Sequence, residues 1–180
     1  MRTLIFTGSL MATLAASAQS ADFVDAIFEI DEAAMIRAVN AQGGNLTDMT
    51  FQITAPGQAG AAFPGVASQV MYLQYTSVKS AAPDDQRTLS VDVVGGDFPA
   101  GVSLSLAANP AGTGSTGAGH EVVLSNTQQT GVLVSGIGSA YSGTSAGQGI
   151  PIVCLVNFTT ENLDASTAGV VSLQYTLSNY

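Results

Sequence analysis

The sequence predicts an all-β protein: a single β-sandwich of about eight strands that follows an N-terminal extension. From Thr47 onward, apolar and polar residues alternate with a period of two rather than 3.6. Clusters of Gly, Pro, Asn and Asp bound the alternating runs, as is typical of strands joined by turns. No helical pattern separates the runs, which favours a sandwich over a parallel α/β sheet. Length and strand number suit an immunoglobulin-like or a jelly-roll arrangement, and the strand topology stays open.

The first 18 residues are typical of a secretory signal peptide. Arg2 supplies a positive charge, and residues 4–14 form an apolar run that is too short to span a bilayer. Residues 16–18, Ala-Ser-Ala, match a small-x-small cleavage site, so the mature chain is expected to begin at Gln19. The alternative is an apolar first strand. No later segment is long and apolar enough for a membrane span, so we expect a secreted protein.

The composition excludes several classes of function. Charged residues make up 9% of the chain, against about 25% in an average soluble protein. With 13 acidic and 4 basic residues, the chain lacks the Lys and Arg that nucleic acid requires. One Cys and one His cannot supply the four ligands of a structural zinc site, and we expect no cofactor. Cys154 lies within an apolar run and is expected to be a buried thiol; an intermolecular disulfide is the alternative.

Residues 19–44 form an acidic N-terminal extension that is compatible with two structures. It holds five of the 13 acidic residues, which are Asp22, Asp25, Glu29, Asp31 and Glu32. As a strand, it would place Val24, Ala26, Phe28 and Ile30 on one face, opposite most of these acids. As a helix, it would gather an apolar stripe, and residues 32–39 are good helix formers. We favour an extended segment through Ile30, followed by a short helical turn that ends near Gly43.

An alternating, detached N-terminal strand could complete the sheet of another subunit by strand addition. Main-chain hydrogen bonds would then provide the strength of the contact, and alternate side chains would fill pockets. The other interpretation is that residues 19–44 form the first element of their own domain.

The sandwich domain is expected over residues 45–180, with eight alternating runs predicted as strands: residues 47–54, 68–78, 87–94, 102–107, 120–125, 131–135, 150–159 and 169–178. The run over 150–159 is apolar on both faces, which predicts a central strand. The last run alternates Val171, Leu173, Tyr175 and Leu177 with polar residues. Residues 109–119 and 141–149, rich in Gly, Ser and Thr, are predicted loops.

Two motifs resemble catalytic signatures but lack the context that the chemistry needs. Gly112, Gly114 and Gly117 match GxGxxG, yet a strand-like run follows where a nucleotide-binding loop requires a helix. Residues 143–147 match the GxSxG nucleophile elbow around Ser145, and again a strand pattern follows. The only histidine, His120, precedes that serine, whereas in the α/β-hydrolase order it comes last. We therefore predict no catalytic residue and no enzyme activity.

Four segments, in this order, carry a resemblance: residues 70–78 (VMYLQYTSV), 98–104 (FPAGVSL), 136–143 (GIGSAYSG) and 171–177 (VSLQYTL). They resemble small secreted bacterial proteins associated with fimbrial-type chaperones, and the chain is also similar to chaperone–usher pilin subunits. Members of the first group have a cysteine within the GIGS-x-Y stretch, where this chain has Ala140. Pilins commonly carry a disulfide, which a single cysteine cannot form within one chain.

The resemblance implies a pilin-like structural subunit of a surface filament, exported through the periplasm with the help of a chaperone. It implies a homopolymer in which Val24, Ala26, Phe28 and Ile30 are donor-strand residues. The acceptor groove would be lined by Val171, Leu173, Tyr175 and Leu177. The alternative function is a monomeric, secreted β-sandwich module that binds glycans or calcium, and calcium-dependent stabilisation without polymers would favour it.

Overall fold

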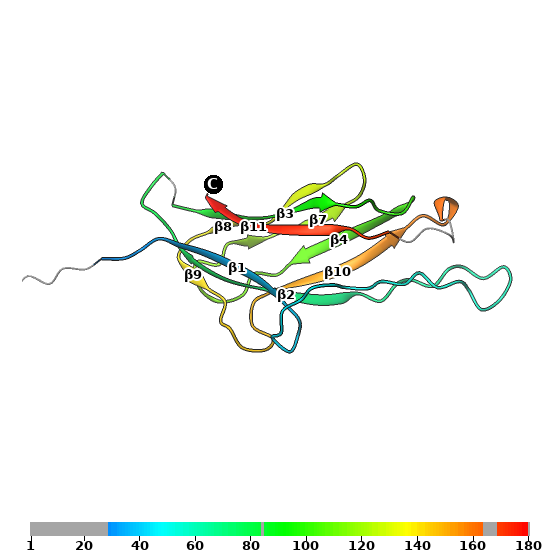
Figure 1. The fold of residues 1–180 in the computed structure, drawn as a ribbon, viewed down its shortest axis with the longest axis horizontal. Helices are drawn as coiled ribbons and strands as arrows, with labels where there is room; N and C mark the ends of the chain where they lie inside the picture. The colour runs from blue at the N-terminus through cyan, green and yellow to red at the C-terminus, as the bar shows by residue number, and fades with distance from the viewer. Residues whose placement is uncertain (1–28, 84, 164–168, 180) are drawn as a thin grey trace, which may run out of the picture. The chain divides into compact units, whose positions relative to one another are not determined.

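The computed structural model describes residues 29–83, 85–163 and 169–179 (Figure 1). The chain divides into two units, residues 1–30 and 31–180. The described part of the second unit is a β-sandwich of two antiparallel sheets, so the predicted fold class is confirmed. The predicted signal peptide and three of the expected donor residues, Val24, Ala26 and Phe28, lie outside the described residues.

The larger sheet, sheet A, has seven strands. They are β1 (Ala33–Val39), β2 (Gln69–Val78), β4 (Val102–Ala108), β5 (Thr113–Gly114), β7 (Glu121–Leu124), β9 (Ala140–Tyr141) and β10 (Ile150–Phe158). The order is β5-β9-β2-β10-β4-β7, and β1 also pairs with β2. Because β1 pairs with the same β2 residues that pair with β10 and β9, it must lie along the opposite side of β2. Strand β1 is therefore an edge of sheet A.

The smaller sheet, sheet B, has four strands in the order β11-β3-β8-β6. They are β3 (Arg87–Gly95), β6 (Ala118–Gly119), β8 (Thr130–Ile137) and β11 (Ser172–Asn179). A short 3-10 helix, η1 (Thr160–Asn162), precedes β11. In the part of the chain that the structure describes, no helix has the length and apolar character needed to cross a membrane.

The core lies between the two sheets and is built from one side of each strand. The side chains that are at most 1% exposed include Leu73, Leu89, Val91, Leu106, Leu124, Leu133, Val134, Ile137, Ile150, Ile152 and Cys154. In most strands this pattern follows the period of two, since alternate residues of a strand point to opposite faces. In β8 the adjacent Leu133 and Val134 are both buried, where the pairing with β3 changes register. Strand β10 lies between β2 and β4, as expected of a central strand. Its outer face, however, is open, with Val153 and Leu155 about two-fifths exposed.

Two predicted elements differ in the structure. The helical turn expected over residues 32–39 is wrong, because these residues form β1. Pairing with β2 satisfies the backbone groups on one side of this strand and places Ile36 and Ala38 against the core, which outweighs a helix preference of a few tenths of a kcal/mol per residue. From Ala33 onward, the expected N-terminal extension is therefore part of the sandwich.

The strand predicted over residues 47–54 is also wrong: the segment is extended but has no ladder of backbone hydrogen bonds. Leu46 N donates to Ala38 O at 3.1 Å, and Gln69 Nε2 donates to Thr50 O at 2.6 Å. Met49 and Phe51 nevertheless pack against the core. The alternation gave the side-chain directions correctly, but it cannot show whether a partner strand is within reach.

The glycines of the GxGxxG match have a structural role. The loop predicted over 109–119 holds β5 and β6, which pair with β9 and β8. A Cβ atom on Gly112 would lie 2.5 Å from Tyr141 O, and one on Gly114 would lie 2.3 Å from Ser139 O. Both residues also have positive φ, at 142° and 99°. Close backbone packing therefore accounts for these glycines.

Candidate functional site

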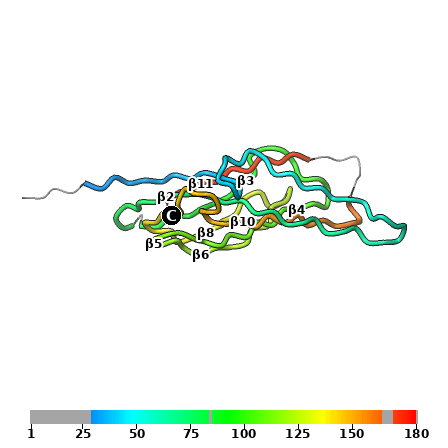
Figure 2. The backbone as a smooth tube through the Cα atoms, turned by 90° about the horizontal axis from the view of Figure 1, so that it is seen from below, coloured from blue at the N-terminus to red at the C-terminus, as the bar shows by residue number. Residues whose placement is uncertain are grey.

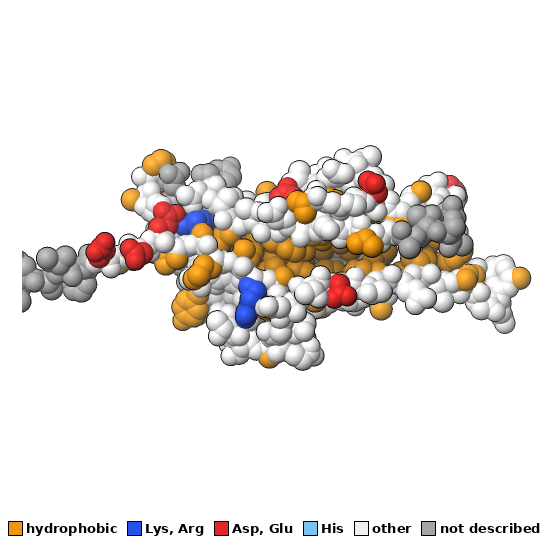
Figure 3. Space-filling view, viewed as in Figure 1, with side chains coloured by type: hydrophobic (Ala, Val, Ile, Leu, Met, Phe, Trp, Pro, Cys, Tyr) orange, Lys and Arg blue, Asp and Glu red, His pale blue; other side chains and the backbone are white. Residues whose placement is uncertain are grey.

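The two edge strands β1 and β11 lie side by side along one border of the sandwich (Figures 1 and 2). Between the sheets on this side, hydrophobic side chains form a continuous band at the surface (Figure 3). We call the following partly buried residues, all packed against the core, the apolar stripe: Ile36, Ala38, Leu46, Met49 and Phe51 from β1 and the segment after it, and Val171, Leu173, Tyr175 and Leu177 from β11 and the residue before it. Along this border, the apolar side chains of the core are therefore only partly covered.

The four predicted acceptor residues all belong to the apolar stripe. Leu173 lies opposite Val93, Tyr175 opposite Val91 and Leu177 opposite Leu89, so the three face the same interior as these β3 residues. The Tyr175 hydroxyl donates a hydrogen bond to Met71 Sδ at 3.5 Å. Burial, with a smaller effect of the Cys154 thiolate, raises the pKa of Tyr175, so its phenol stays neutral. Each acceptor side chain is therefore apolar or neutral.

Strand β11 is an edge strand with an available backbone. Among the described strands it pairs only with β3, and its one register irregularity lies between Ser172 and Leu173. From Leu173 to Asn179 the pairing with β3 is regular, and the strand Ser-Leu-Gln-Tyr-Thr-Leu-Ser-Asn contains no charge and no proline. Natural sheets usually protect such an edge with charges, prolines or bulges. A long unprotected edge is suited to the addition of another strand.

Of the four predicted donor residues, only Ile30 is described. Its side chain is 82% exposed. Complete burial of a large aliphatic side chain is favourable by about 1.5–3 kcal/mol. The exposed Ile30 side chain does not gain this free energy within its own chain. The described end of the N-terminal segment therefore carries an apolar residue that a partner surface could bury.

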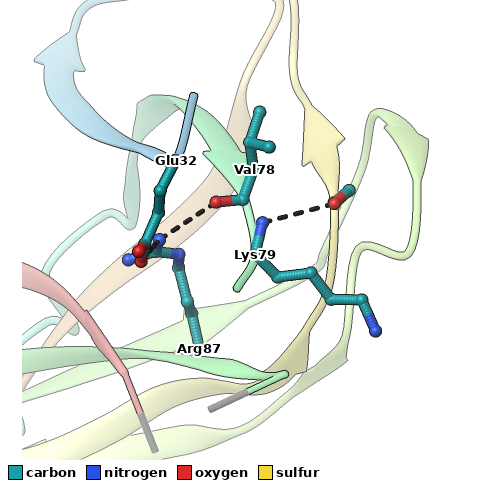
Figure 4. Close-up of polar contacts among 5 residues, drawn as sticks. Glu32, Val78, Lys79 and Arg87 are labelled. Atoms are coloured by element: carbon teal, nitrogen blue, oxygen red, sulfur yellow. Dashed lines mark hydrogen bonds and ion pairs between the residues drawn. The ribbon is translucent and has the colours of Figure 1, made fainter. Parts of the chain in front are cut away.

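An ion pair anchors the start of β1 to the rest of the sandwich (Figure 4). Arg87 is only 3% exposed, and its Nη2 donates to Glu32 Oε1 and, at 3.1 Å, to Val78 O. Glu32 is thereby tied to the end of β2 and the start of β3. This pair was not predicted, although the sequence contains a signal for it: Arg87 shares the inward phase of Leu89, Val91 and Val93.

The ion pair predicts a loss of stability in acid. A hydrogen bond from Ser80 lowers the pKa of Glu32 below its usual 4.5; desolvation opposes this, and Arg87 adds to it. A depressed carboxyl pKa stabilises the fold above the unfolded-state value, and that contribution is lost as the pH falls through the folded-state value. We expect the melting temperature of Glu32→Gln to lie below that of the unsubstituted chain at pH 6, and the two to converge below about pH 4.5. Thermal melts from pH 3 to 6 check this, and a constant difference would contradict it.

Among the described residues, no histidine is hydrogen-bonded to the serine of the GxSxG match. Ser145 lies in a loop that packs over Gln74 on the outer face of β2, where its carbonyl accepts a hydrogen bond from Gln74 Nε2 at 3.1 Å. His120 Nε2 is instead hydrogen-bonded to Ser135 Oγ at 2.8 Å. Within residues 29–83, 85–163 and 169–179, no group of His, Cys, Asp and Glu side chains could hold a metal ion. The structure thus gives the motif a structural role as part of a covering loop.

The Cys154 thiol is buried, as expected. It is 1% exposed, and burial raises its pKa to about 11. The reactive thiolate is therefore scarce at neutral pH, and a thiol of another chain cannot reach the sulfur in this structure. These facts argue against the alternative of an intermolecular disulfide.

The fold places the edge strand β11 within a stripe of partly buried apolar side chains. Comparison with models of known protein families gives no match, and comparisons with curated proteins and with solved structures give no significant match. The resemblance to pilin subunits therefore stays a prediction.

Proposed function

We propose that the chain is an exported structural subunit of a surface filament or matrix. In this proposal, residues 22–30 of one copy add as a strand along β11 of the next copy. The observation that carries it is the regular, uncharged edge of β11 beside the apolar stripe. Strand addition uses the unpaired main-chain groups of such an edge for strength and alternate side chains for specificity.

The side-chain pattern of the donor segment fits this arrangement. Val24, Ala26, Phe28 and Ile30 would face the apolar stripe and cover Leu173, Tyr175 and Leu177. The acids on the other face of the donor would lie beside the outward residues of β11, which are Ser172, Gln174, Thr176 and Ser178. Like charges directly opposite each other destabilise a strand pair, and β11 has none.

The net charge of −9 would favour assembly through a specific contact over unspecific aggregation. Acidic copies repel one another at long range, which limits unspecific association. The donor segment and the acceptor edge can still pair, because the contact is short-ranged and the edge is neutral. A periplasmic chaperone that occupies the same edge during export would protect it until assembly, as the resemblance implies.

A peptide test addresses the acceptor edge directly. We expect a synthetic peptide of residues 19–31 to bind, one to one, to a chain that lacks residues 19–30, and to raise its melting temperature. Residues 31–180 form a compact unit by themselves, so this deletion leaves the sandwich intact. Titration calorimetry and thermal melts measure the effect.

The control peptide carries Phe28→Asp, which places a charge on the apolar face of the donor. It should not bind, because a buried, unpaired carboxylate costs several kcal/mol. Equal binding of both peptides, or no binding of the natural peptide, would count against strand addition.

A further inference from the structure

A row of side chains crosses the outer face of sheet A beside the loop that holds the GxSxG match. Met35 and Tyr141 both lie opposite Thr76, on its two sides, and Thr113 lies opposite Tyr141. Thr76 is in the outward phase of β2, since its neighbours Tyr75 and Ser77 are buried. The Tyr141 side chain is therefore directed away from the core, and it is 55% exposed.

Tyr141 lines two adjoining depressions of the surface. The larger has a volume of about 330 Å³ and is lined by Gly112, Gly143 and Gly149 together with Thr113 and Gln148. The smaller, of about 240 Å³, is lined by Thr76, Val78 and Ser139. Because the phenol ring borders both, a ligand seated in either depression would contact it. Known ligand pockets start at roughly 300 Å³, so the larger depression suits a small ligand.

The chemistry of the larger depression selects a neutral, hydroxyl-rich ligand. None of its lining residues is charged, which disfavours phosphates, nucleotides and acidic sugars. Gly112 is exposed and Gly143 is partly exposed, so no side chain of their own covers their backbone groups, whereas Gly149 is buried. Gln148 Oε1 already accepts a hydrogen bond from Ser145 N at 2.9 Å, so its Nε2 is the group left to donate. Ser142 Oγ accepts from Tyr75 N at 2.9 Å and thus belongs to the scaffold.

A pyranose ring combines the two properties that this surface would recognise. One of its faces presents aliphatic C–H groups that stack on an aromatic ring, and its rim presents hydroxyls for backbone and amide groups. We propose that Tyr141 and the glycine-lined depression beside it form a binding site for a neutral saccharide unit. The site lies on sheet A, apart from the β11 edge, so it is independent of strand addition and compatible with it.

The test uses the full-length secreted chain and resins that carry glucose-, galactose-, mannose- or N-acetylglucosamine-ended oligosaccharides. We expect retention on at least one resin for the unsubstituted chain and for Tyr141→Phe, which keeps the ring. Tyr141→Ala should bind about tenfold more weakly or not at all, as measured by elution with free saccharide. Val153→Ala, which removes another exposed apolar side chain from the same face, should leave retention unchanged.

Three outcomes would overturn the proposal: no retention on any neutral resin, equal retention of Tyr141→Ala, or retention only on sialylated or sulfated resins. Thermal melts confirm that the variants fold, and the exposure of Tyr141 predicts little loss of stability. Polymer length, measured on the same samples, should not change with Tyr141→Ala. Failure of this site therefore leaves strand addition untouched, and the reverse holds as well.

Discussion

Removing residues 19–30, with the predicted signal peptide kept for export, is expected to convert the secreted protein from polymers into monomers. The deletion removes all four donor residues, so no copy can fill the edge of another. It ends before Glu32 and β1, because Glu32 anchors the sandwich through Arg87 and β1 pairs with β2. A longer deletion through residue 40 would remove an edge strand and mix a folding defect with an assembly defect. Light scattering and electron microscopy of the secreted material measure the change.

The matched control replaces Asp25 and Glu29 with Asn and Gln and keeps the apolar face of the donor segment. It should still polymerise, since in this arrangement the acids face away from the acceptor edge. Polymers that persist after the deletion would refute assembly through the N-terminal segment. Loss of polymers in the control as well as in the deletion would show that the charges of the segment, rather than its apolar face, direct assembly.

Leu173→Asp is expected to abolish polymerisation from the acceptor side. Leu173 faces the apolar stripe from β11, and a carboxylate there would become buried and unpaired when a donor strand is added. The penalty, of several kcal/mol, exceeds what one aliphatic contact contributes. Gln174→Lys is the matched control, because this neighbouring residue is exposed on the opposite face of the same strand and lies opposite Asp92 of β3. It adds a charge without placing it opposite a like charge, and it should leave polymers intact.

Mixing gives this prediction a second readout. The Leu173→Asp chain keeps a donor segment, and the chain without residues 19–30 keeps an intact edge. Together they should form a one-to-one dimer that grows no further, as measured by size-exclusion chromatography. If Leu173→Asp and Gln174→Lys impair assembly equally, any charge on this strand is the cause, and burial of residue 173 under a donor strand is not. Melting temperatures of both variants separate unfolding from an assembly defect.

Local patterns in the sequence predicted most of the sandwich. The period of two located β2, β3, β4, β7, β8, β10 and β11 close to their observed bounds. The same alternation placed Leu173, Tyr175 and Leu177 on a common face, because side-chain direction in a strand depends only on position along it. Arg87 is in phase with the inward residues of β3, but its burial was not predicted, and its partner Glu32 could not be inferred from the pattern.

Only the tertiary structure decided which extended segments have partners. Residues 33–39 have helix-forming side chains but become β1, since the free side of β2 supplies hydrogen bonds and a core surface. Residues 47–54 alternate like a strand but form no ladder. Pairing depends on which backbone groups meet in space, and a local pattern carries no such information. For the same reason, the apolar face of the last strand could be predicted from the sequence. That this strand is an edge, and that it lies beside β1, follows only from the fold.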